Sequence, residues 1–266
     1  MTDAIFTVPQ PVNEPVLNFA PGSPEKLSLK KALADAKASQ KDIPMFIGGK
    51  HVFSEEKVAM RPPHERKHML GHYSKGNASH VKSAIDAALA AKPAWEAMPW
   101  QERAAIFLRA ADLLTGPYRS RMLAATMLCQ SKNAYQAEID CICELADFWR
   151  YNVHFMEKIY QQQPISSRTI WNRTDWRPLE GFIFALTPFN FTAIAGNLPT
   201  APAMLGNVAV WKPAESQIYS AAVIMEILEA AGLPAGVINL VYVDGPTVGD
   251  VVFRHPSFAG LHFTGS

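Results

Sequence analysis

The stretch LEGFIFALTPFNFTAIAGNLPTAPAMLGNVAVWKPAE, residues 179–215, decides the fold. Its first apolar run, residues 182–186, is short, continuous and rich in aromatic side chains, which is typical of a strand buried inside a parallel sheet. Thr187-Pro188 must end that strand, because proline cannot continue a central ladder of hydrogen bonds. A helix-like segment leads to a second apolar strand at residues 208–211. The stretch therefore predicts a strand, a helix and a strand, the repeating unit of a parallel α/β sheet.

Polar side chains follow both predicted strands. Asn190 comes just after the first strand, and Lys212 and Glu215 follow the second. Taken singly, an asparagine suits a turn and a lysine suits the solvated surface. Two successive parallel strands, however, end at the same edge of a sheet, and open α/β sheets bind ligands in the crevice outside the carboxyl ends of their strands. We therefore expect a ligand site that includes Asn190 and Lys212.

Three motifs carry a resemblance to a known family. The segments T-P-F-N-F at 187–191, W-K-P-A-E at 211–215 and F-T-G-S at 263–266 resemble the aldehyde dehydrogenase superfamily in order and separation. Further segments narrow the resemblance to the branch that oxidises glutamate semialdehyde, the Δ1-pyrroline-5-carboxylate dehydrogenases. These are Q-A-E-I-D at 136–140, Q-Q-P-I at 162–165, L-E-G-F at 179–182 and F-N-F-T-A-I at 189–194. The similarity begins near Asn13-Glu14-Pro15-Val16 and covers nearly the whole chain.

The resemblance implies a reaction: NAD-dependent oxidation of L-glutamate 5-semialdehyde, in equilibrium with cyclic 1-pyrroline-5-carboxylate, to L-glutamate in proline catabolism. In the family, the nucleophilic cysteine and the general-base glutamate come after the F-T-G-S segment. We therefore expect this chain to be an N-terminal half that lacks the catalytic domain and is inactive alone. Two alternatives stay open, an aldehyde dehydrogenase for another semialdehyde and a non-catalytic nucleotide-binding fragment.

Three residues are candidates for the substrate side of the site. Asn190 is the candidate oxyanion donor, because its carboxamide NH2 stabilises developing negative charge without carrying a charge that must be desolvated. Phe191 either packs against the apolar stem of the substrate or belongs to the core. Glu138 is either a carboxylate near the mouth of the active site or a solvated or salt-bridged helix residue.

Lys212 and Glu215 are candidates for binding the two hydroxyls of the adenosine ribose. A carboxylate there disfavours a 2′-phosphate, which favours NAD over NADP. The resembled branch often carries another residue where Glu215 stands. Backbone groups of three residues are expected along the path of the cofactor: Thr187, Pro188 and Phe189.

The usual dinucleotide fingerprint G-x-G-x-x-G is absent from the sequence. The resemblance implies that F-T-G-S takes its place, with Gly265 allowing close backbone approach and Ser266 offering a hydroxyl or amide to the pyrophosphate. Gly245 and Gly249 lie in the segment 244–249, which is either a second cofactor-side loop or a plain turn.

The three cysteines are Cys129, Cys141 and Cys143. Cys141 and Cys143 are two residues apart on a predicted helix and so point to different faces, which makes a shared metal difficult. We expect all three to be small buried apolar side chains. The eight histidines show no ligand spacing, and no metal is assigned. Three cysteines do not make a disulfide framework, so a reducing compartment is expected.

Composition narrows the class of protein. The chain has 266 residues, of which 48% are hydrophobic and 18% charged, which predicts a sizeable core and argues against disorder. A formal charge of +1 does not suggest a nucleic-acid or anionic-membrane surface. Residues 179–196 are interrupted by Glu180, Pro188 and Asn190 and make a poor membrane span. No targeting segment is visible, and the resemblance implies the mitochondrial matrix in a eukaryote or the cytoplasm in a bacterium.

The predicted fold class is α/β, a doubly wound parallel sheet with an N-terminal helical block and a small β flap. Four regions are expected: an arm and helix (1–42), strands and helices of the cofactor domain (43–160), the flap (161–180) and a Rossmann-like NAD-binding core (181–266). The expected strands are 182–186, 208–211, 237–243 and one from 261, with a hairpin at Gly48-Gly49 and a short strand at 69–73. The expected helices are 24–39, 79–98, 100–114, 118–130, 133–160, 193–205, 216–231 and 246–253. Weak alternation at 169–177 suggests exposed strands, and the resemblance implies that this flap makes a homodimer or higher homo-oligomer.

Overall fold

A six-stranded sheet forms the centre of the molecule in the computed structural model, which describes residues 5–265. The strand order is β3-β2-β8-β7-β6-β9. The strands are β2 (Met45–Ile47), β3 (Lys50–Val52), β6 (Phe182–Leu186), β7 (Ala209–Lys212), β8 (Ile238–Leu240) and β9 (Phe258–Phe263). The last four are mutually parallel, whereas β2 pairs antiparallel with β8 and β3 antiparallel with β2. The predicted parallel α/β sheet is confirmed, and the hairpin at Gly48-Gly49 extends it.

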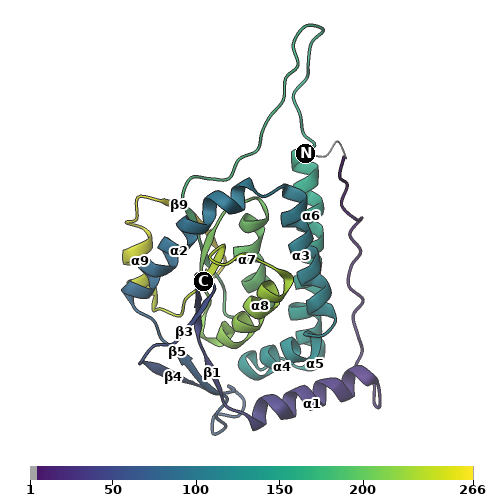
Figure 1. Cartoon of the computed structure of the whole chain (residues 1–266). Helices are drawn as coiled ribbons and strands as arrows, with labels where there is room; N and C mark the ends of the chain where they lie inside the picture. Colours follow the sequence, from purple (N-terminus) through teal and green to yellow (C-terminus); the bar gives the residue numbers. More distant parts are fainter. Residues whose placement is uncertain (1–4, 266) are drawn as a thin grey trace.

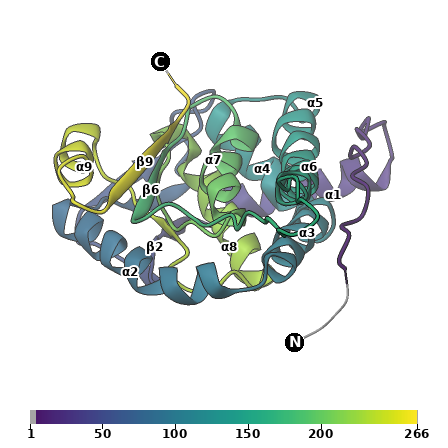
Figure 2. The same cartoon turned by 90° about the horizontal axis from the view of Figure 1, so that it is seen from above.

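The strand order reverses at β6. From β6 the chain passes through α7 (Thr192–Met204) to β7, and through α8 (Ile218–Ala231) to β8. It then returns through α9 (Gly245–Val252) to β9, on the other side of β6. Figure 2 shows α7 and α9 on opposite sides of β6 and β9. This arrangement is doubly wound, and its switch point lies at the carboxyl end of β6, where such sheets bind ligands.

A block of helices surrounds the sheet. It comprises α2 (Ala78–Ala97), α3 (Trp100–Thr115), α4 (Arg119–Gln130), α5 (Ala134–Ala137), the π-helical segment η1 (Glu138–Glu144) and α6 (Leu145–Tyr160). Of these, α2 packs on the strands of the sheet, and most of the others pack on α7 and α8. The predicted single helix 133–160 is therefore interrupted by a π-helical stretch, which hydrophobic periodicity does not reveal. The buried face of η1 and α6 carries Ile142, Leu145, Trp149, Val153 and Met156, while Tyr160 is partly buried.

A second, three-stranded sheet has the order β1-β5-β4. Its strands are β1 (Lys41–Ile43), β4 (Lys57–Met60) and β5 (Gly71–Ser74). Of these strands the sequence predicted β5, as the short strand at 69–73, but not the sheet itself. Gly71 is required where β5 passes β1, because it has φ 132° and a Cβ there would lie 2.0 Å from the Lys41 carbonyl oxygen. Just after β5, the Gly76 N–H donates to the Tyr242 carbonyl at 2.8 Å. The small sheet thereby brings residues 73–75 to the carboxyl edge of the main sheet.

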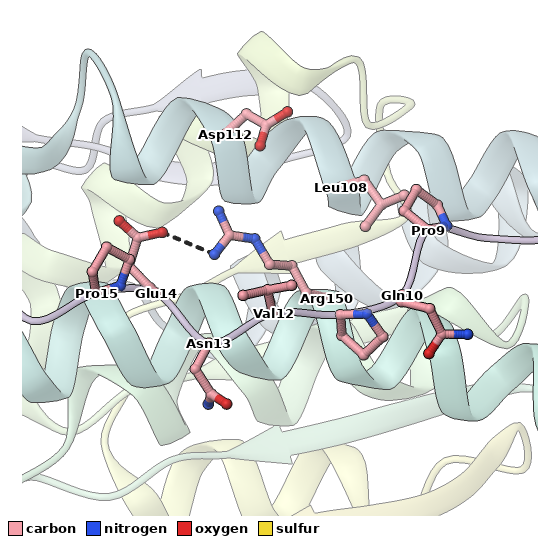
Figure 3. Close-up of a pocket in the computed structure, with 10 residues that line it drawn as sticks. Pro9, Gln10, Val12, Asn13, Glu14, Pro15, Leu108, Asp112 and Arg150 are labelled. Atoms are coloured by element: carbon pink, nitrogen blue, oxygen red, sulfur yellow. Dashed lines mark hydrogen bonds and ion pairs between the residues drawn. The ribbon is translucent and has the colours of Figure 1, made fainter.

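The N-terminal arm lies along the helical block and leads into α1 (Pro24–Ala38) (Figure 1). Ser23 caps α1 by accepting a hydrogen bond from the Lys26 N–H at 3.4 Å. Glu14 anchors the arm, because its two carboxylate oxygens each lie 2.8 Å from a guanidinium, one on Arg119 and one on Arg150. Figure 3 shows the pair with Arg150.

Residues 161–180 form a long excursion that projects from the body beyond the end of α6 (Figure 1). The strands predicted at 169–177 are wrong, since the structure assigns no strand to this described segment. Its two arms are joined mainly by side chains, such as the Gln163 amide bonding to the backbone of Thr174 in both directions. A two-stranded ribbon without a sheet to pack on is marginally stable, which accounts for the difference.

No helix in the described residues is long and apolar enough to cross a membrane.

Candidate cofactor and active site

The carboxyl ends of β6 and β7 meet at one edge of the sheet. The strands are parallel neighbours with Leu186 opposite Lys212, and the Thr187 N–H donates to the Lys212 carbonyl at 3.2 Å. The Trp211 indole N–H donates to the Thr187 hydroxyl at 3.0 Å, which ties the two strand ends together. The predicted placement of Asn190 and Lys212 at the ends of adjacent parallel strands is confirmed. Their roles in binding and catalysis remain predictions.

Asn190 lies on a short exposed loop between β6 and α7. The Ser216 hydroxyl donates to the Phe189 carbonyl at 2.9 Å, so the loop is tied to the turn that follows β7. Phe189 and Phe191 are 57% and 38% exposed. The core alternative for Phe191 is thus excluded, and its ring instead lies under the ammonium of Lys132, 4.3 Å from Nζ to the ring centroid.

A pocket of about 150 Å³ opens at the carboxyl ends of β7 and β8. Lys212, Glu215 and Gly245, three of the predicted cofactor residues, line it together. Burial lowers the pKa of Lys212, although the carboxylates of Glu215 and Asp244 act in the opposite direction. The complete lining is Tyr73, Lys75, Lys212, Pro213, Glu215, Ile218, Tyr242, Val243, Asp244 and Gly245.

Several of these lining residues could not be predicted from the sequence. Tyr73 and Lys75 come from β5 and the turn after it, which belong to the unpredicted second sheet. Burial raises the pKa of Tyr73 to about 12, with smaller contributions from Glu215 and Glu56. The one sequence signal was Lys75-Gly76 directly after a short strand, the same pattern of polar residues after a strand that marked Asn190 and Lys212.

The predicted glycines differ in their surroundings. Gly245 begins α9, whose N-cap Asp244 accepts a hydrogen bond from the Thr247 N–H at 3.0 Å. Nothing lies within 4 Å of a Cβ built on Gly245, so the start of α9 is open on that side. Gly249 lies within α9, so at Gly249 the segment 244–249 is neither the cofactor-side loop nor the plain turn that were the two alternatives.

Gly265 follows β9, next to Thr264, whose N–H donates to the Leu186 carbonyl at 3.3 Å. This bond holds residues 263–265 beside the end of β6, at the switch point of the sheet. Ser266, the last predicted pyrophosphate contact, lies outside the described residues.

Glu138 is not at the mouth of a site, and its prediction as a substrate-side carboxylate is wrong. Its side chain is fully buried in the π-helical segment, forms an ion pair with Arg119 and accepts a hydrogen bond from the Leu17 N–H at 3.1 Å. Of the two alternatives for Glu138, the salt-bridged helix carboxylate is the correct one. A buried carboxylate needs such a partner, because an unpaired charge in the interior is costly.

The three cysteines are buried and unbonded to one another, as predicted. Burial raises the pKa of Cys129 to about 12 and that of Cys143 to about 12, so neither forms a reactive thiolate near neutral pH. Burial also raises the pKa of Cys141 well above its ordinary value. Among residues 5–265, no group of three or more His, Cys, Asp or Glu side chains is placed to hold a metal ion.

The sequence has many relatives of known name. It is 47% identical over 265 residues to the Δ1-pyrroline-5-carboxylate dehydrogenase of Agaricus bisporus, covering 99% of this chain and 48% of that protein. It is 44% identical to the mitochondrial Δ1-pyrroline-5-carboxylate dehydrogenase of Homo sapiens, covering 96% of this chain and 45% of that protein. The chain thus spans about half the length of these relatives.

The fold also matches solved structures. The crystal structure of the Δ-pyrroline-5-carboxylate dehydrogenase from Mycobacterium tuberculosis superposes with a TM-score of 0.98 at 53% identity, covering 100% of this chain and 49% of that chain. A second structure of that protein, bound with NAD, matches equally well, with 50% of that chain covered. The model of the aldehyde dehydrogenase family matches residues 52–266, which is most of the sequence. With a matching family model, a matching fold and a site at the expected switch point, the chain belongs to the aldehyde dehydrogenase family.

Proposed function

We propose that this chain supplies the cofactor-binding part of an NAD-dependent 1-pyrroline-5-carboxylate dehydrogenase, which oxidises L-glutamate 5-semialdehyde to L-glutamate in proline catabolism. One observation carries the proposal: Asn190 follows the switch-point strand, and Lys212 and Glu215 line a pocket on the adjoining strand ends. The relatives named above support the choice of aldehyde. Their names also support NAD, because a solved relative is bound with it.

Each residue has a defined task in this proposal. Lys212 and Glu215 bind the two ribose hydroxyls, and the backbone of residues 187–189 lines the path of the dinucleotide. The amide of Asn190 donates to the oxyanion that forms when a nucleophile adds to the aldehyde. NAD, when bound, accepts the hydride released from that adduct. Gly265 leaves room for close backbone approach to the pyrophosphate.

The test is NADH formation, followed by absorbance, in protein expressed from the complete coding sequence and supplied with 1-pyrroline-5-carboxylate. Turnover with this substrate and little with other semialdehydes is expected. Faster turnover of another semialdehyde would favour the alternative aldehyde dehydrogenase. Calorimetry with NAD on the 266-residue chain tests the remaining alternative, a non-catalytic nucleotide-binding module. That alternative would hold if the chain binds NAD while the complete protein oxidises no aldehyde.

Replacing Lys212 by methionine should weaken NAD binding and stabilise the fold. Losing a charged hydrogen-bond donor costs about 10- to 100-fold in affinity. Because burial lowers the pKa of Lys212, the folded chain holds that proton less tightly than the unfolded chain. The charged lysine therefore reduces stability near neutral pH, and the native chain recovers this loss as the pH rises through the folded-state pKa. Calorimetry with NAD and urea unfolding at pH 7 and pH 10 measure both effects.

The matched control is Lys57→Met, which removes a lysine in an exposed pair with Asp42. It should leave NAD affinity unchanged and shift the free energy of unfolding by less than about 1 kcal/mol. A K212M protein that binds NAD as the native chain does would contradict the assignment of Lys212 to the ribose.

The exposed excursion at 161–180 is proposed to join copies of the protein. Ile165 and Trp171 are each 92% exposed, and large apolar side chains in such a position mark an interaction surface. The proposed assembly is a homodimer or higher homo-oligomer, as the resemblance implies. Sedimentation of the complete protein and of its Trp171→Ser variant tests this, since a monomeric native protein would exclude it. The proposed location is the mitochondrial matrix in a eukaryote or the cytoplasm in a bacterium.

A further inference from the structure

A buried carboxylate from another helix holds the start of α7, directly after Asn190 and Phe191. Asp140 is 1% exposed, and its two oxygens accept hydrogen bonds from the Thr192 N–H at 3.0 Å and the Ala193 N–H at 2.9 Å. The first N–H groups of a helix have no partner within the helix, and a negative charge there complements the helix dipole. Asp140 therefore fixes the first turn of α7 against the π-helical segment η1.

Lys132 connects this carboxylate to the aromatic neighbour of Asn190. Its Nζ lies 2.6 Å from Asp140 Oδ2 and 4.3 Å from the centre of the Phe191 ring. The Lys132 side chain is only 16% exposed, so the ammonium is held between the two groups. A cation over an aromatic face is attracted to it, and more strongly where water is excluded. One ammonium thus links Asp140 to Phe191.

Further contacts hold both sides of the Asn190 loop. The Thr192 hydroxyl accepts from the Gln130 amide at 2.6 Å and lies 3.0 Å from the hydroxyl of Thr126. On the other side, the Ser216 hydroxyl holds the Phe189 carbonyl. The exposed amide of Asn190 therefore stands between two anchored residues, so the direction it faces depends on those anchors.

We propose that Asp140 and Lys132 are positioning residues, which set the direction of the Asn190 amide and the plane of the Phe191 ring at the aldehyde. The inference rests on the proposed function. Neither residue touches the reacting atoms. An oxyanion donor works only when it lies about 2.7–3.1 Å from the developing charge, and a misplacement of about 1 Å can cost about 100-fold in rate.

The test compares two buried carboxylates of the same π-helical segment in the complete protein. Asp140→Asn keeps the shape of the side chain but loses the charge that holds Lys132 and the α7 N–H groups. We expect kcat to fall about 10- to 100-fold. KM for NAD should change less than about twofold, because Lys212 and Glu215 lie at the end of β7, away from the first turn of α7 that Asp140 holds. Glu138→Gln, the matched control, faces the N-terminal arm and should lower the melting temperature while keeping kcat within about twofold.

A second pair of variants keeps the test decisive if Asp140→Asn does not fold. Lys132→Met removes the cation and should lower kcat, whereas Lys132→Arg retains a charge that can pair with Asp140 and stack on Phe191. Arginine should restore kcat to within about threefold of the native value. If Lys132 were needed only for folding, kcat would fall in step with the melting temperature in both variants. Arginine would then not restore kcat by itself.

Several outcomes would overturn the inference. Native kcat in Asp140→Asn or in Lys132→Met would do so, and so would an equal loss of kcat in Glu138→Gln, which would make the effect a general loss of stability. If the native protein does not oxidise 1-pyrroline-5-carboxylate or another aldehyde, the proposed function fails and this inference with it. An active native protein with unchanged variants overturns this inference alone.

Discussion

Replacing Asn190 by alanine in the complete protein should lower kcat by about 10²–10³-fold. The amide lies exposed after the switch-point strand, between the anchored residues Phe189 and Thr192. The task proposed for it, donation to the oxyanion, exists only once the aldehyde carbonyl has been attacked. An interaction made only in the transition state lowers kcat and kcat/KM equally when it is lost. Steady-state kinetics with varied 1-pyrroline-5-carboxylate measures both.

The matched control is Asn197→Ala, in α7, the helix that follows the Asn190 loop. The Asn197 side chain accepts a hydrogen bond from the Asn152 amide at 2.8 Å, so its loss removes a contact between α6 and α7. This variant should lose some stability and keep its kcat. An Asn190→Ala enzyme in which only KM rises would show that Asn190 binds the substrate without stabilising the oxyanion.

The sequence predicted the parts of the fold that depend on local pattern. The continuous apolar run of β6, the proline after it and the glycine that ends α8 are each set by nearby residues. The same pattern located Asn190 and Lys212 at the ends of adjacent strands. Such features are readable because burial and backbone geometry constrain a few consecutive positions.

The misses concern residues whose environment depends on distant segments. Glu138 belongs to a motif of the family, but its partners Arg119 and Leu17 are 19 and 121 residues away in sequence. Periodicity could not show that the arm folds back over this carboxylate. Likewise, Tyr73 and Lys75 reach the pocket only because Gly71 lets β5 pass close to β1. The chemical character of Glu138, Tyr73 and Lys75 could be read from the sequence, but the distant segments that they contact could not.

Replacing Arg119 by methionine should destabilise the 266-residue chain by about 3–5 kcal/mol, the usual cost of removing one partner from a buried ion pair. Arg119 lies between two carboxylates, Glu138, which is fully buried, and Glu14, which is nearly so. Burial alone would lower the pKa of Arg119, but the hydrogen bonds that its guanidinium donates to Glu138 and Glu14 outweigh burial and raise that pKa. The guanidinium is therefore firmly charged, and its loss leaves Glu138 without a counter-charge. Urea unfolding measures the difference.

Arg121→Met is the matched control, because it removes an arginine from the same helix that pairs at the surface with Glu226. Its expected cost is below about 1 kcal/mol.

A double variant separates the electrostatic cause from lost packing. Adding Glu138→Gln to Arg119→Met removes the unpaired charge, and the glutamine oxygen can still accept the Leu17 N–H. The double variant should therefore recover at least half of the lost stability, although it carries one more substitution. Arg150 still holds Glu14 in both variants (Figure 3), so the arm keeps one anchor throughout. If the double variant is less stable than Arg119→Met alone, packing of the arginine stem, and not the burial of Glu138, sets the cost.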